Sequence, residues 1–381
     1  MYIFEKFSWD CIAASKEKRA KMDELMAESD EVASRQRELD DGSDDIIPLD
    51  ESASVIARDA GSVYALNELV IDVRAAFQED KRGLITFGFL SFTIFLMILG
   101  FYAFVISPLD ILVNGSLYEK AWNIPAFIYL IVSSAMWTGI NYFVWKYTWK
   151  WIRTEVFTHR HLVARFNRRT RQVHINRPAY AGGVVTLPWD AVVPVIDPDH
   201  EEYVGIGGVL ILGFMSEQTG AGYDETLMLG RPMSGNAELV GFWEYIRRFM
   251  EDGPDSVPRP KRLLKLHPFT WEPLRAATRF MSLTWRPGGR LGTVIAATLL
   301  SPLILLLAFC HWISLFLCYQ PRWPKIIEEA GQPGKPVPKL TVAEDFGPEI
   351  AERLRANCLL DRASQPLPPF KRKSFKKQVT D

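Results

Sequence analysis

Residues 84–106 read LITFGFLSFTIFLMILGFYAFVI, a stretch without a single charged side chain. Residues 124–145 and 291–319 share this property, and the three segments hold 23, 22 and 29 residues. A bilayer core of about 30 Å requires roughly 20 apolar residues, because each adds about 1.5 Å of helical rise. Unpaired backbone amides are costly in lipid, so each segment should be helical. The sequence therefore predicts an integral membrane protein with three hydrophobic helical segments.

The charges that flank the first two segments predict their orientation, because Lys and Arg concentrate on the cytoplasmic side. Lys81 and Arg82 precede the first segment, and eight basic residues between positions 146 and 171 follow the second. The connection 107–123 holds only one Lys against two acidic residues. We therefore expect the N-terminus and the long middle region in the cytoplasm, and the connection outside.

The third segment has two possible exit sides. Basic residues balance across it, Arg286 and Arg290 before it against Arg322 and Lys325 after it, and Pro302 lies inside it. A single kinked span would put the C-terminal tail outside, whereas a re-entrant hairpin broken at Pro302 would return the tail to the cytoplasm. Two full crossings need roughly 40 residues, so one long span is favoured. A cytoplasmic tail is the alternative.

The middle region has the pattern of a β domain. Short runs rich in β-branched and aromatic residues are separated by turn-forming residues. The runs cover residues 152–158, 161–167, 172–176, 184–187, 191–196, 209–215 and 225–229. An amphipathic helix over 236–250 follows and stops at Gly253 and Pro254. Seven antiparallel strands closed by one helix favour a pleckstrin-homology-like barrel or sandwich, so the expected fold class is an α+β integral membrane protein.

Changes in composition divide the chain into six parts. These are cytosolic N-terminal helices with an acidic loop (1–80), a transmembrane hairpin (81–147), the β-rich domain (148–254), an interfacial linker rich in Pro, Arg and Trp (255–290), the third hydrophobic segment (291–319), and a Pro-rich tail with a basic end (320–381). In the first part we expect a helix over 16–34. Steps of three and four residues from Val63 to Phe77 predict a second one, which would pack on the first helix or on another copy of the chain. The tail should hold a short helix near 343–357.

The residues that could carry catalysis do not form a recognised motif. The six histidines lack the H-E-x-x-H spacing of zinc hydrolases, and the four cysteines lie too far apart for a metal-ligand pattern. Neither a phosphate-binding loop nor a G-x-S-x-G elbow occurs. We therefore expect no enzyme activity, no catalytic residue, no metal and no cofactor. The net charge of −1 conceals an acidic cluster within 40–51 and a basic cluster within 371–377, which we interpret as solvated runs.

The basic stretch 146–171 is the most prominent feature outside the hydrophobic segments. Its place beside a bilayer predicts attraction to anionic lipid, worth about 1 kcal/mol per basic residue near the headgroups. The candidate partner- or lipid-binding residues are Arg165, Arg168, Arg169, Arg171, Trp189 and Asp190. Nucleic acid would attract similar charges, but these charges already account for the orientation, so no nucleic-acid partner is expected.

The middle region carries phrases that resemble an uncharacterised proteobacterial membrane-protein family, namely RFNRR at 165–169, LPWD at 187–190 and FWEYIRRFM at 242–250. Members of that family are similar in having two early spans, a β-rich cytosolic domain and a late hydrophobic block, and they tend to accompany type VI secretion effector genes. The phrase LPWDAV at 187–192 also looks like a strand of the pleckstrin-homology-like domains that follow a two-span hairpin in bacterial membrane proteins. The resemblance supplies no catalytic motif.

The resemblance implies a non-enzymatic, multi-pass protein of the bacterial inner membrane that binds a macromolecular partner. Its role would be that of a type VI secretion immunity or accessory protein, and the partner would be a toxin or a secretion component. The alternative is a membrane-anchored regulator or assembly factor that senses lipid or protein through the β domain. Small residues in the second and third segments leave homo-oligomerisation open.

Overall fold

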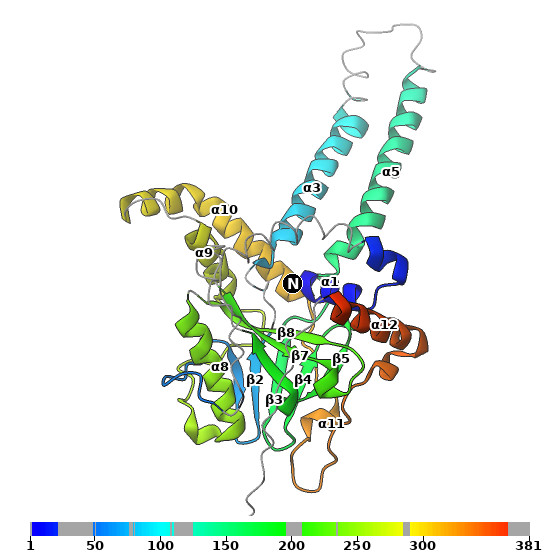
Figure 1. The fold of residues 1–381 in the computed structure, drawn as a ribbon. Helices are drawn as coiled ribbons and strands as arrows, with labels where there is room; N and C mark the ends of the chain where they lie inside the picture. The colour runs from blue at the N-terminus through cyan, green and yellow to red at the C-terminus, as the bar shows by residue number, and fades with distance from the viewer. Residues whose placement is uncertain are drawn as a thin grey trace, which may run out of the picture.

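Two antiparallel sheets lie at the base of a pair of long helices in the computed structural model of the chain (Figure 1). The structure describes residues 2–21, 49, 51–75, 79, 81–106, 109, 125–195, 208–233, 235–284 and 290–364. The predicted acidic cluster within 40–51 lies almost wholly outside these residues, and the basic cluster within 371–377 lies entirely outside them. The same holds for the connection 107–123 apart from Leu109.

The first sheet has five strands in the order of the sequence, β1 to β5. They are β1 (Val63–Leu66), β2 (Val70–Arg74), β3 (Val163–Asn167), β4 (Gln172–Asn176) and β5 (Val184–Pro188). The second sheet has three strands, β6 (Val192–Val195), β7 (Gly208–Phe214) and β8 (Glu225–Met233). All neighbours are antiparallel, and a bridge between Ala75 and Leu229 links the two sheets. The helices α3 and α5 lie between β2 and β3 in the sequence, so the long hairpin leaves from and returns to one sheet.

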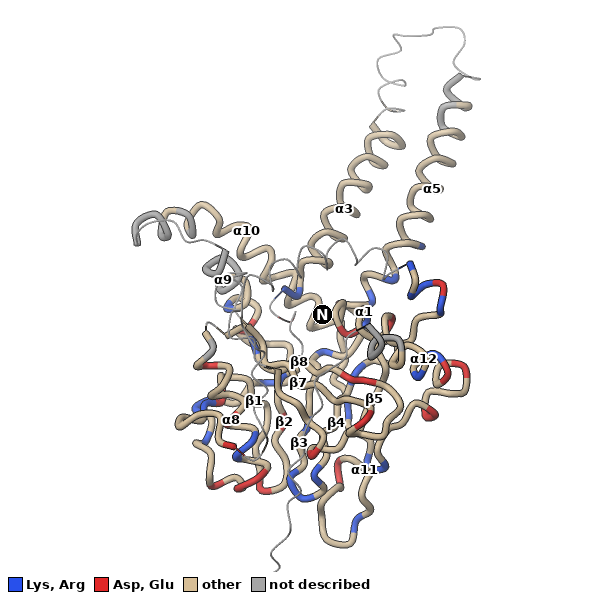
Figure 2. The backbone as a smooth tube through the Cα atoms, in the orientation of Figure 1, with Lys and Arg blue, Asp and Glu red and all other residues tan. Residues whose placement is uncertain are grey.

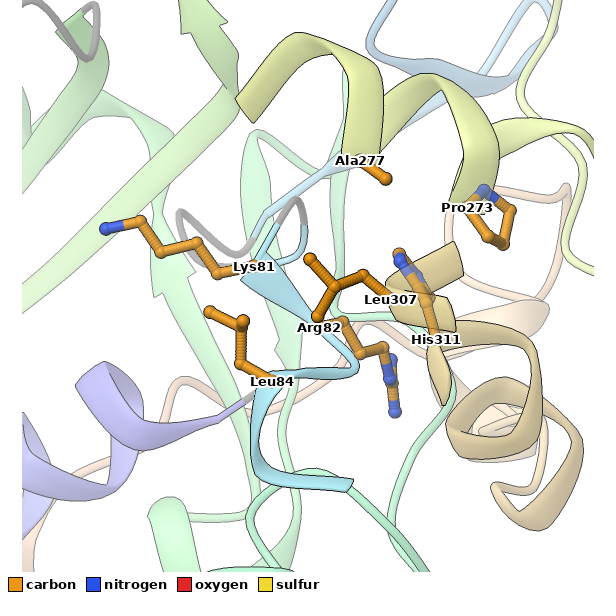
Figure 3. Close-up of a pocket in the computed structure, with 7 residues that line it drawn as sticks. All are labelled: Lys81, Arg82, Leu84, Pro273, Ala277, Leu307 and His311. Carbon is orange, nitrogen blue, oxygen red and sulfur yellow. The ribbon is translucent and has the colours of Figure 1, made fainter. Parts of the chain in front are cut away.

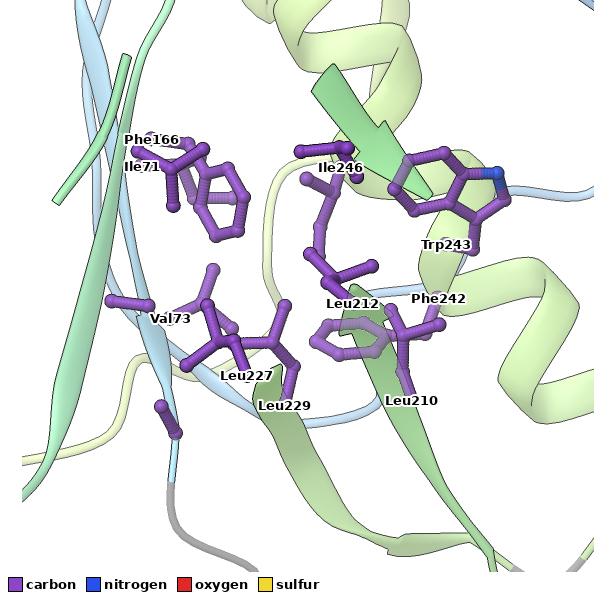
Figure 4. Close-up of a cluster of buried hydrophobic side chains, with 14 of the residues drawn as sticks. Ile71, Val73, Phe166, Leu210, Leu212, Leu227, Leu229, Phe242, Trp243 and Ile246 are labelled. Carbon is purple, nitrogen blue, oxygen red and sulfur yellow. The ribbon is translucent and has the colours of Figure 1, made fainter. Parts of the chain in front are cut away.

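The helix α8 (Asn236–Glu251) covers the core between the sheets, as the sequence predicted. It contributes Phe242, Trp243 and Ile246, all fully buried. Figure 4 shows these side chains facing residues from both sheets: Ile71, Val73, Phe166, Leu210, Leu212, Leu227 and Leu229. The indole of Trp189 stacks on that of Trp243, with ring centroids 5.6 Å apart. A mixed α+β fold is thus confirmed.

The predicted helix from Val63 to Phe77 is wrong, because residues 63–66 and 70–74 form β1 and β2. All five residues of β2 are buried, so the strand lacks the apolar and polar alternation that identifies strands in a sequence. Asn67 makes the turn, and its side-chain oxygen accepts the backbone N–H groups of Leu69 and Val70. Phe77 lies outside the described residues. Of the expected helix over 16–34, the structure describes 16–21, which are helical.

Six of the seven strands predicted in the middle region are present and begin within two residues of the expected positions. The strand predicted over 152–158 is not, because α5 (Pro125–Ile152) continues to its first residue and turns follow. The amides of Glu155 and Val156 both bond to the carbonyl of Ile152, so the backbone continues in helical turns after α5 and does not become a strand. Phe157 then reverses the chain with a positive φ of 57°.

The long hairpin pairs α3 (Leu84–Phe101), extended by the π-helical turn η2 (Tyr102–Ile106), with α5 (Figure 1). The indole of Trp137 fills the space over Gly100, where an added Cβ would lie 2.7 Å from the indole nitrogen. That nitrogen donates to the carbonyl of Leu96 at 3.3 Å. By length and composition, two helices of the described chain could cross a membrane, Leu84–Ile106 and Thr298–Leu317. The sequence predicted three such segments, and α5 is not one of these two.

The C-terminal third forms a second helical hairpin and then returns to the sheets. It comprises α9 (Glu272–Thr284), α10 (Arg290–Leu317), α11 (Lys325–Glu328), the 3₁₀ turn η6 (Ala343–Phe346) and α12 (Pro348–Ser364). The helix predicted near 343–357 is therefore confirmed. We call residues 318–364 the strap, because they run along the domain: Thr341 bonds to Thr186 in β5, and Gln172 in β4 donates to the carbonyl of Pro338. Asn357 reaches the N-terminal helix α1 (Ile3–Ile12).

These contacts bear on the exit side of the third segment, for which one span with the tail outside was favoured and a cytoplasmic tail was the alternative; both stay predictions. The chain before α10 lies on the domain, since the amide of Leu264 bonds to the carbonyl of Val63 at 2.8 Å, and the strap after α10 lies on the same domain. The alternative hairpin is also changed in detail, since α10 is continuous through Pro302 and the reversal falls between α9 and α10. Sequence hydropathy found the apolar segment but had no information on what its flanks contact.

Candidate functional site

The arginines proposed for binding have partners within the domain. Arg165 on β3 makes two hydrogen bonds to the carboxylate of Asp72 on β2, at 2.7 and 2.8 Å, and its guanidinium lies 4.9 Å from the ring centre of Trp323. Asp72 and Arg165 are direct cross-strand neighbours, so the register of β2 and β3 fixes the pair. This pair joins a strand before the long hairpin to one after it.

Arg171, Trp189 and Asp190 form a single network with Glu251 at the end of α8. The guanidinium of Arg171 donates to both Asp190 and Glu251, and the buried indole of Trp189 donates to Glu251 at 2.6 Å. Arg168 and Arg169, the other two predicted site residues, lie on the turn between β3 and β4. Arg169 donates to the carbonyl of Gly331 in the strap, and the guanidinium of Arg168 lies against Gly253. The structure therefore brings together three of the six predicted site residues.

The β3–β4 turn is at the end of the sheet remote from the long hairpin. One end of the first sheet holds the paired residues Arg74, Val163 and Asn176. The chain leaves β2 at this end, and α3 is the next helix. Asn167 and Gln172 pair at the other end, next to the turn, and Figure 2 shows basic residues there. Arg168, Arg169 and Arg171 thus point to a surface away from the side where α3 emerges. Their role in binding stays a prediction.

A different cluster, which we call the junction, lies where α3 leaves the domain and centres on Arg82. The Arg82 side chain is completely buried, and its guanidinium donates to the carboxylate of Glu79 at 2.9 Å and to the carbonyl of Glu155 at 2.9 Å. It also donates to the hydroxyl of Ser314 on α10 at 2.8 Å, to the sulfur of Cys318 and to the carbonyl of Arg160. From its place just before α3, this one side chain therefore bonds to the segment that follows α5 and to the end of α10.

Glu155 caps α3 from the other side of the junction. Its carboxylate accepts the backbone N–H groups of Ile85 and Thr86, at 3.2 and 3.1 Å, together with the Thr86 hydroxyl. A carboxylate at a helix N-terminus satisfies free amides and interacts favourably with the helix dipole. Its backbone carbonyl accepts from Ser314 at 3.0 Å and from Cys318 at 3.2 Å. Glu155 thus holds the beginning of α3 against the end of α10.

Arg160 supplies the complementary charge at the end of α10. Its guanidinium donates to the carbonyls of Leu315 at 2.9 Å and Cys318 at 2.7 Å, and to that of Leu266 at 3.3 Å. A cation at a helix C-terminus pairs with its unsatisfied carbonyls. The chain just before α3 lies very close to α10, and only a glycine fits at position 83, because a Cβ there would lie 2.7 Å from the backbone nitrogen of His311.

Electrostatics at the junction favour ionised groups despite burial. Burial would raise the pKa of Glu79, yet Arg82 and His161 hold it well below its usual value. Burial would likewise lower the pKa of Arg82, but the charge of Glu79 keeps it raised. For His161 the balance is reversed: burial lowers its pKa although Glu79 lies 3.3 Å from its Nδ1. The pair is therefore a buried salt bridge beside a neutral imidazole.

Two small cavities adjoin this salt bridge. One of about 20 Å³ is lined by residues of α9, α10 and the start of α3, and Figure 3 shows Arg82, Leu307 and His311 around it. The other, of about 30 Å³, lies between His161, Glu79 and the segment before α9. Each has room for about one water molecule and none for an organic substrate. In the described part of the chain no group of three His, Cys, Asp or Glu residues could hold a metal ion.

Chemically, the junction is suited to joining parts of the molecule. Charge-assisted hydrogen bonds, which are the stronger kind, connect the start of α3, the segment after α5 and the end of α10. Sequence reasoning missed it, because Lys81 and Arg82 were read only as the basic flank of a span. Glu155, Arg160 and Ser314 lie about 70 to 230 positions away, so no local signal could associate them with Arg82.

Comparison with known proteins yields one match. A family model described as a family of unknown function (DUF6708) matches residues 142–332. The matched region begins within α5, contains β3 to β8, α8 and Arg160 of the junction, and ends in the strap after α11. No curated protein and no solved structure matches the chain.

Proposed function

The chain belongs to the DUF6708 family, whose function is unknown, and on that premise we propose that it is a non-enzymatic binding protein of the bacterial inner membrane. Its α+β domain faces the cytoplasm and captures a macromolecular partner. The partner is a toxin or component of type VI secretion, and the chain acts as its immunity or accessory protein. This last step rests on the resemblance of residues 165–169, 187–190 and 242–250.

One observation carries the proposal, namely the way the junction fixes the long hairpin to the domain. Arg82 and Glu155 hydrogen-bond across α3, α5 and α10, and both are buried. A flexible tether would leave the domain free to leave the membrane surface, whereas this junction holds it there. Such an arrangement suits a protein whose task is to meet its partner at the bilayer.

The topology we propose places both ends of the long hairpin in the cytoplasm, because β2 and β3 are paired neighbours. We place the N-terminal helix α1 and the strap in the cytoplasm as well, since both lie on the same domain. The two sheets with α8 across one end support a pleckstrin-homology-like domain. The paired turn residues Lys81 and Arg82 before α3, and the basic residues after α5, agree with this orientation.

A partner surface is available on α8. Residues 51–58 lie across this helix, held by Arg248 donating to the carbonyls of Ser54 and Val55. They present two apolar side chains to solvent, Val55 at 91% and Ile56 at 56% exposure. Exposed apolar groups held in a fixed geometry are typical of the centre of a protein interface.

The second candidate is a membrane-anchored regulator or assembly factor. The observation that favours it is that hydrogen bonds link the end of α10 to Arg82 before α3 and to Arg160 after α5, since movement of α10 against α3 would break them. A ligand of the helices could bias the domain through such a two-state contact. It differs from the first candidate in needing no toxin.

The deciding experiment is a toxicity assay with the product of any toxin-like gene beside the coding sequence. Co-expression of the full chain should restore growth. The variant Val55→Asp with Ile56→Asp should lose this rescue while remaining in the membrane fraction with an unchanged melting temperature. Val337→Asp is the matched control, because Val337 is 60% exposed in the strap. A neighbour that is toxic but not neutralised would reject the immunity role, and turnover by the purified protein would reject a non-enzymatic one.

A further inference from the structure

The hairpin of α9 and α10 starts and ends on the domain. Before α9, the amide of Leu264 bonds to the carbonyl of Val63 in β1 at 2.8 Å. After α10, the amide of Tyr319 bonds to the carbonyl of Thr158 at 3.1 Å. If the domain lies on one side of a bilayer, both flanks of this hairpin lie on that side too. A complete crossing by α10 would then require a complete crossing by α9.

The lengths of the helices do not allow two crossings. The 13 residues of α9 reach about 20 Å, less than the roughly 30 Å of a bilayer core. Figure 1 shows that α10 bends away from α3 and α5, and Pro302 inside it accounts for the bend. Its two arms, 290–301 and 303–317, are about 18 and 22 Å long, so neither spans the core alone.

The surface of α10 nevertheless suits lipid. One face is buried, with Ala308 and Ile304 packed against Ala277 of α9. The opposite face exposes large apolar side chains along both arms: Ile295, Leu299, Leu303, Leu305, Leu306, Phe309 and Phe316. No Lys, Arg, Asp or Glu occurs from 291 to 321. A helix with one protein-packed face and one apolar open face matches burial in a single leaflet. Arg286 and Arg290 precede the apolar part of α10 and would have to reach the headgroups, so the hairpin would lie along the leaflet and would not point to the bilayer centre.

The segment 259–271, which precedes α9, adds charge complementarity. It exposes four basic residues, Arg259, Lys261, Arg262 and Lys265. Phe269 at 76% and Trp271 at 65% exposure follow them. No Asp or Glu occurs between 256 and 271. Basic groups near an anionic surface contribute about 1 kcal/mol each, and aromatic side chains favour the interface.

We infer that α9 and α10 form a re-entrant hairpin in the cytoplasmic leaflet, and that the segment 259–271 docks on anionic lipid headgroups beside it. The inference rests on the proposed membrane location and adds to it the depth of α10 and the class of lipid recognised. The membrane-facing surface of the domain is then this segment rather than the β3–β4 turn.

The test uses the full chain in nanodiscs, in a background without native cysteines whose melting temperature matches the wild type. Single cysteines replace Phe269, Ile295, Met97 and Val337 and carry an environment-sensitive dye. Lipids bear a nitroxide either near the headgroup or near the chain end. Met97, 64% exposed on α3, reports insertion of the long hairpin, and Val337 reports the surface remote from it.

We expect the dye at 269 to be quenched by the shallow nitroxide and the dye at 295 more by the deep one, with neither quenching the dye at 337. Quenching at 269 should fall when phosphatidylglycerol is replaced by phosphatidylcholine and when salt rises to 1 M, where the screening length falls to about 3 Å. Exchange of all four basic residues for Gln should abolish this lipid dependence. The matched control exchanges four cations remote from α9, Lys325, Lys335, Lys339 and Arg353, for Gln and should keep it.

Stronger shallow than deep quenching at 295 would show that this part of α10 lies at a membrane interface, through complete crossing or through lack of insertion, and would overturn the hairpin. Equal quenching at 269 in neutral and anionic nanodiscs would overturn lipid recognition. The probe at 97 separates these failures from failure of the proposed function. If 97 is unquenched by the deep nitroxide, the long hairpin is not inserted and the membrane anchor itself is wrong.

Discussion

Replacement of Arg82 by Met should destabilise the protein more than any change at its surface. Met keeps much of the side-chain length but removes the guanidinium, so the buried carboxylate of Glu79 loses its ion-pair partner at 2.9 Å. Breaking a buried ion pair by removing one partner costs about 3 to 5 kcal/mol. The carbonyl of Arg160 and the Ser314 hydroxyl also lose a donor, and each buried group left unsatisfied costs about 1 to 3 kcal/mol.

A loss of about 4 kcal/mol is therefore a cautious expectation. For a folded unit of 150 to 250 residues, each kcal/mol corresponds to about 2 to 4 °C, which predicts a fall in melting temperature of about 8 to 16 °C. The measurement is thermal unfolding of the full chain in detergent, followed by tryptophan fluorescence. Arg82→Lys should recover little, because an ammonium has three donors at one point and lacks the planar fork.

Two comparisons make this prediction refutable. Arg353→Met removes an exposed i,i+4 partner of Glu349 and should cost at most about 1 kcal/mol. Glu79→Gln should restore part of the stability lost in Arg82→Met, because it removes the uncompensated charge. Two results would show that the junction does not hold the helices as described. One is a melting temperature for Arg82→Met within about 3 °C of the wild type. The other is a double variant whose loss of unfolding free energy exceeds the summed losses of the two single variants.

Other parts of the molecule make independent predictions. Arg247, Arg248 and Ser52 hydrogen-bond to Glu244 and, against the effect of burial, lower its pKa to about 2, so its contribution is present above about pH 4.5 and lost as pH falls through 2; Glu244→Gln should flatten the acid limb of a stability profile. Gly100→Leu should drive Trp137 out of its place and slow cross-linking between cysteines at 89 and 145, whose native rings are 6.4 Å apart. Asn357→Ala should cost about 1 to 2 kcal/mol and raise hydrogen exchange in α12 but not in β3, because the amide of Asn357 donates to the carbonyls of Ile12 and Ala14. Unchanged exchange in α12 would mean that the strap is held elsewhere.

The part of the fold that sequence reasoning predicted is the part whose signals are local. The strands β3 to β8 are short runs rich in β-branched and aromatic residues between turn-forming residues, and α8 has a clear apolar stripe ended by Gly253. These signals act within a few residues, so no knowledge of partners was needed. The apolar character of 84–106 and 298–317 was equally direct.

The strands β1 and β2 were missed because the spacing of their apolar residues also fits the period of a helix. Val63, Leu66, Val70 and Val73 are three or four apart, as on a helix, while Ile71 between them is also buried. Burial of β2 on both faces comes from its place beside β3, a partner about 90 positions away. Tertiary pairing therefore decided a segment whose local pattern favoured a helix.

The proposed binding residues were selected for charge, and charge alone does not distinguish a free surface from an internal pair. Arg165 and Arg171 lie in good hydrogen-bond geometry to Asp72 and Asp190, whose proximity depends on the sheet register. Trp189 was placed at the surface, yet it is buried beneath α8. The junction shows the same outcome more strongly, because Arg82, which was interpreted as the basic flank of a span, is fully buried and paired with Glu79.

The adjacency of β2 and β3 has a consequence for biosynthesis. When the ribosome has finished Arg74, the partner strand is still 88 codons away, and both long helices must be made first. At about 5 to 20 residues per second the hairpin of β1 and β2 waits roughly 4 to 18 s with one edge open. A nascent chain whose helices fail to return would never close that edge, so in the proposed membrane location the two helices have to reach the lipid before the sheet is completed.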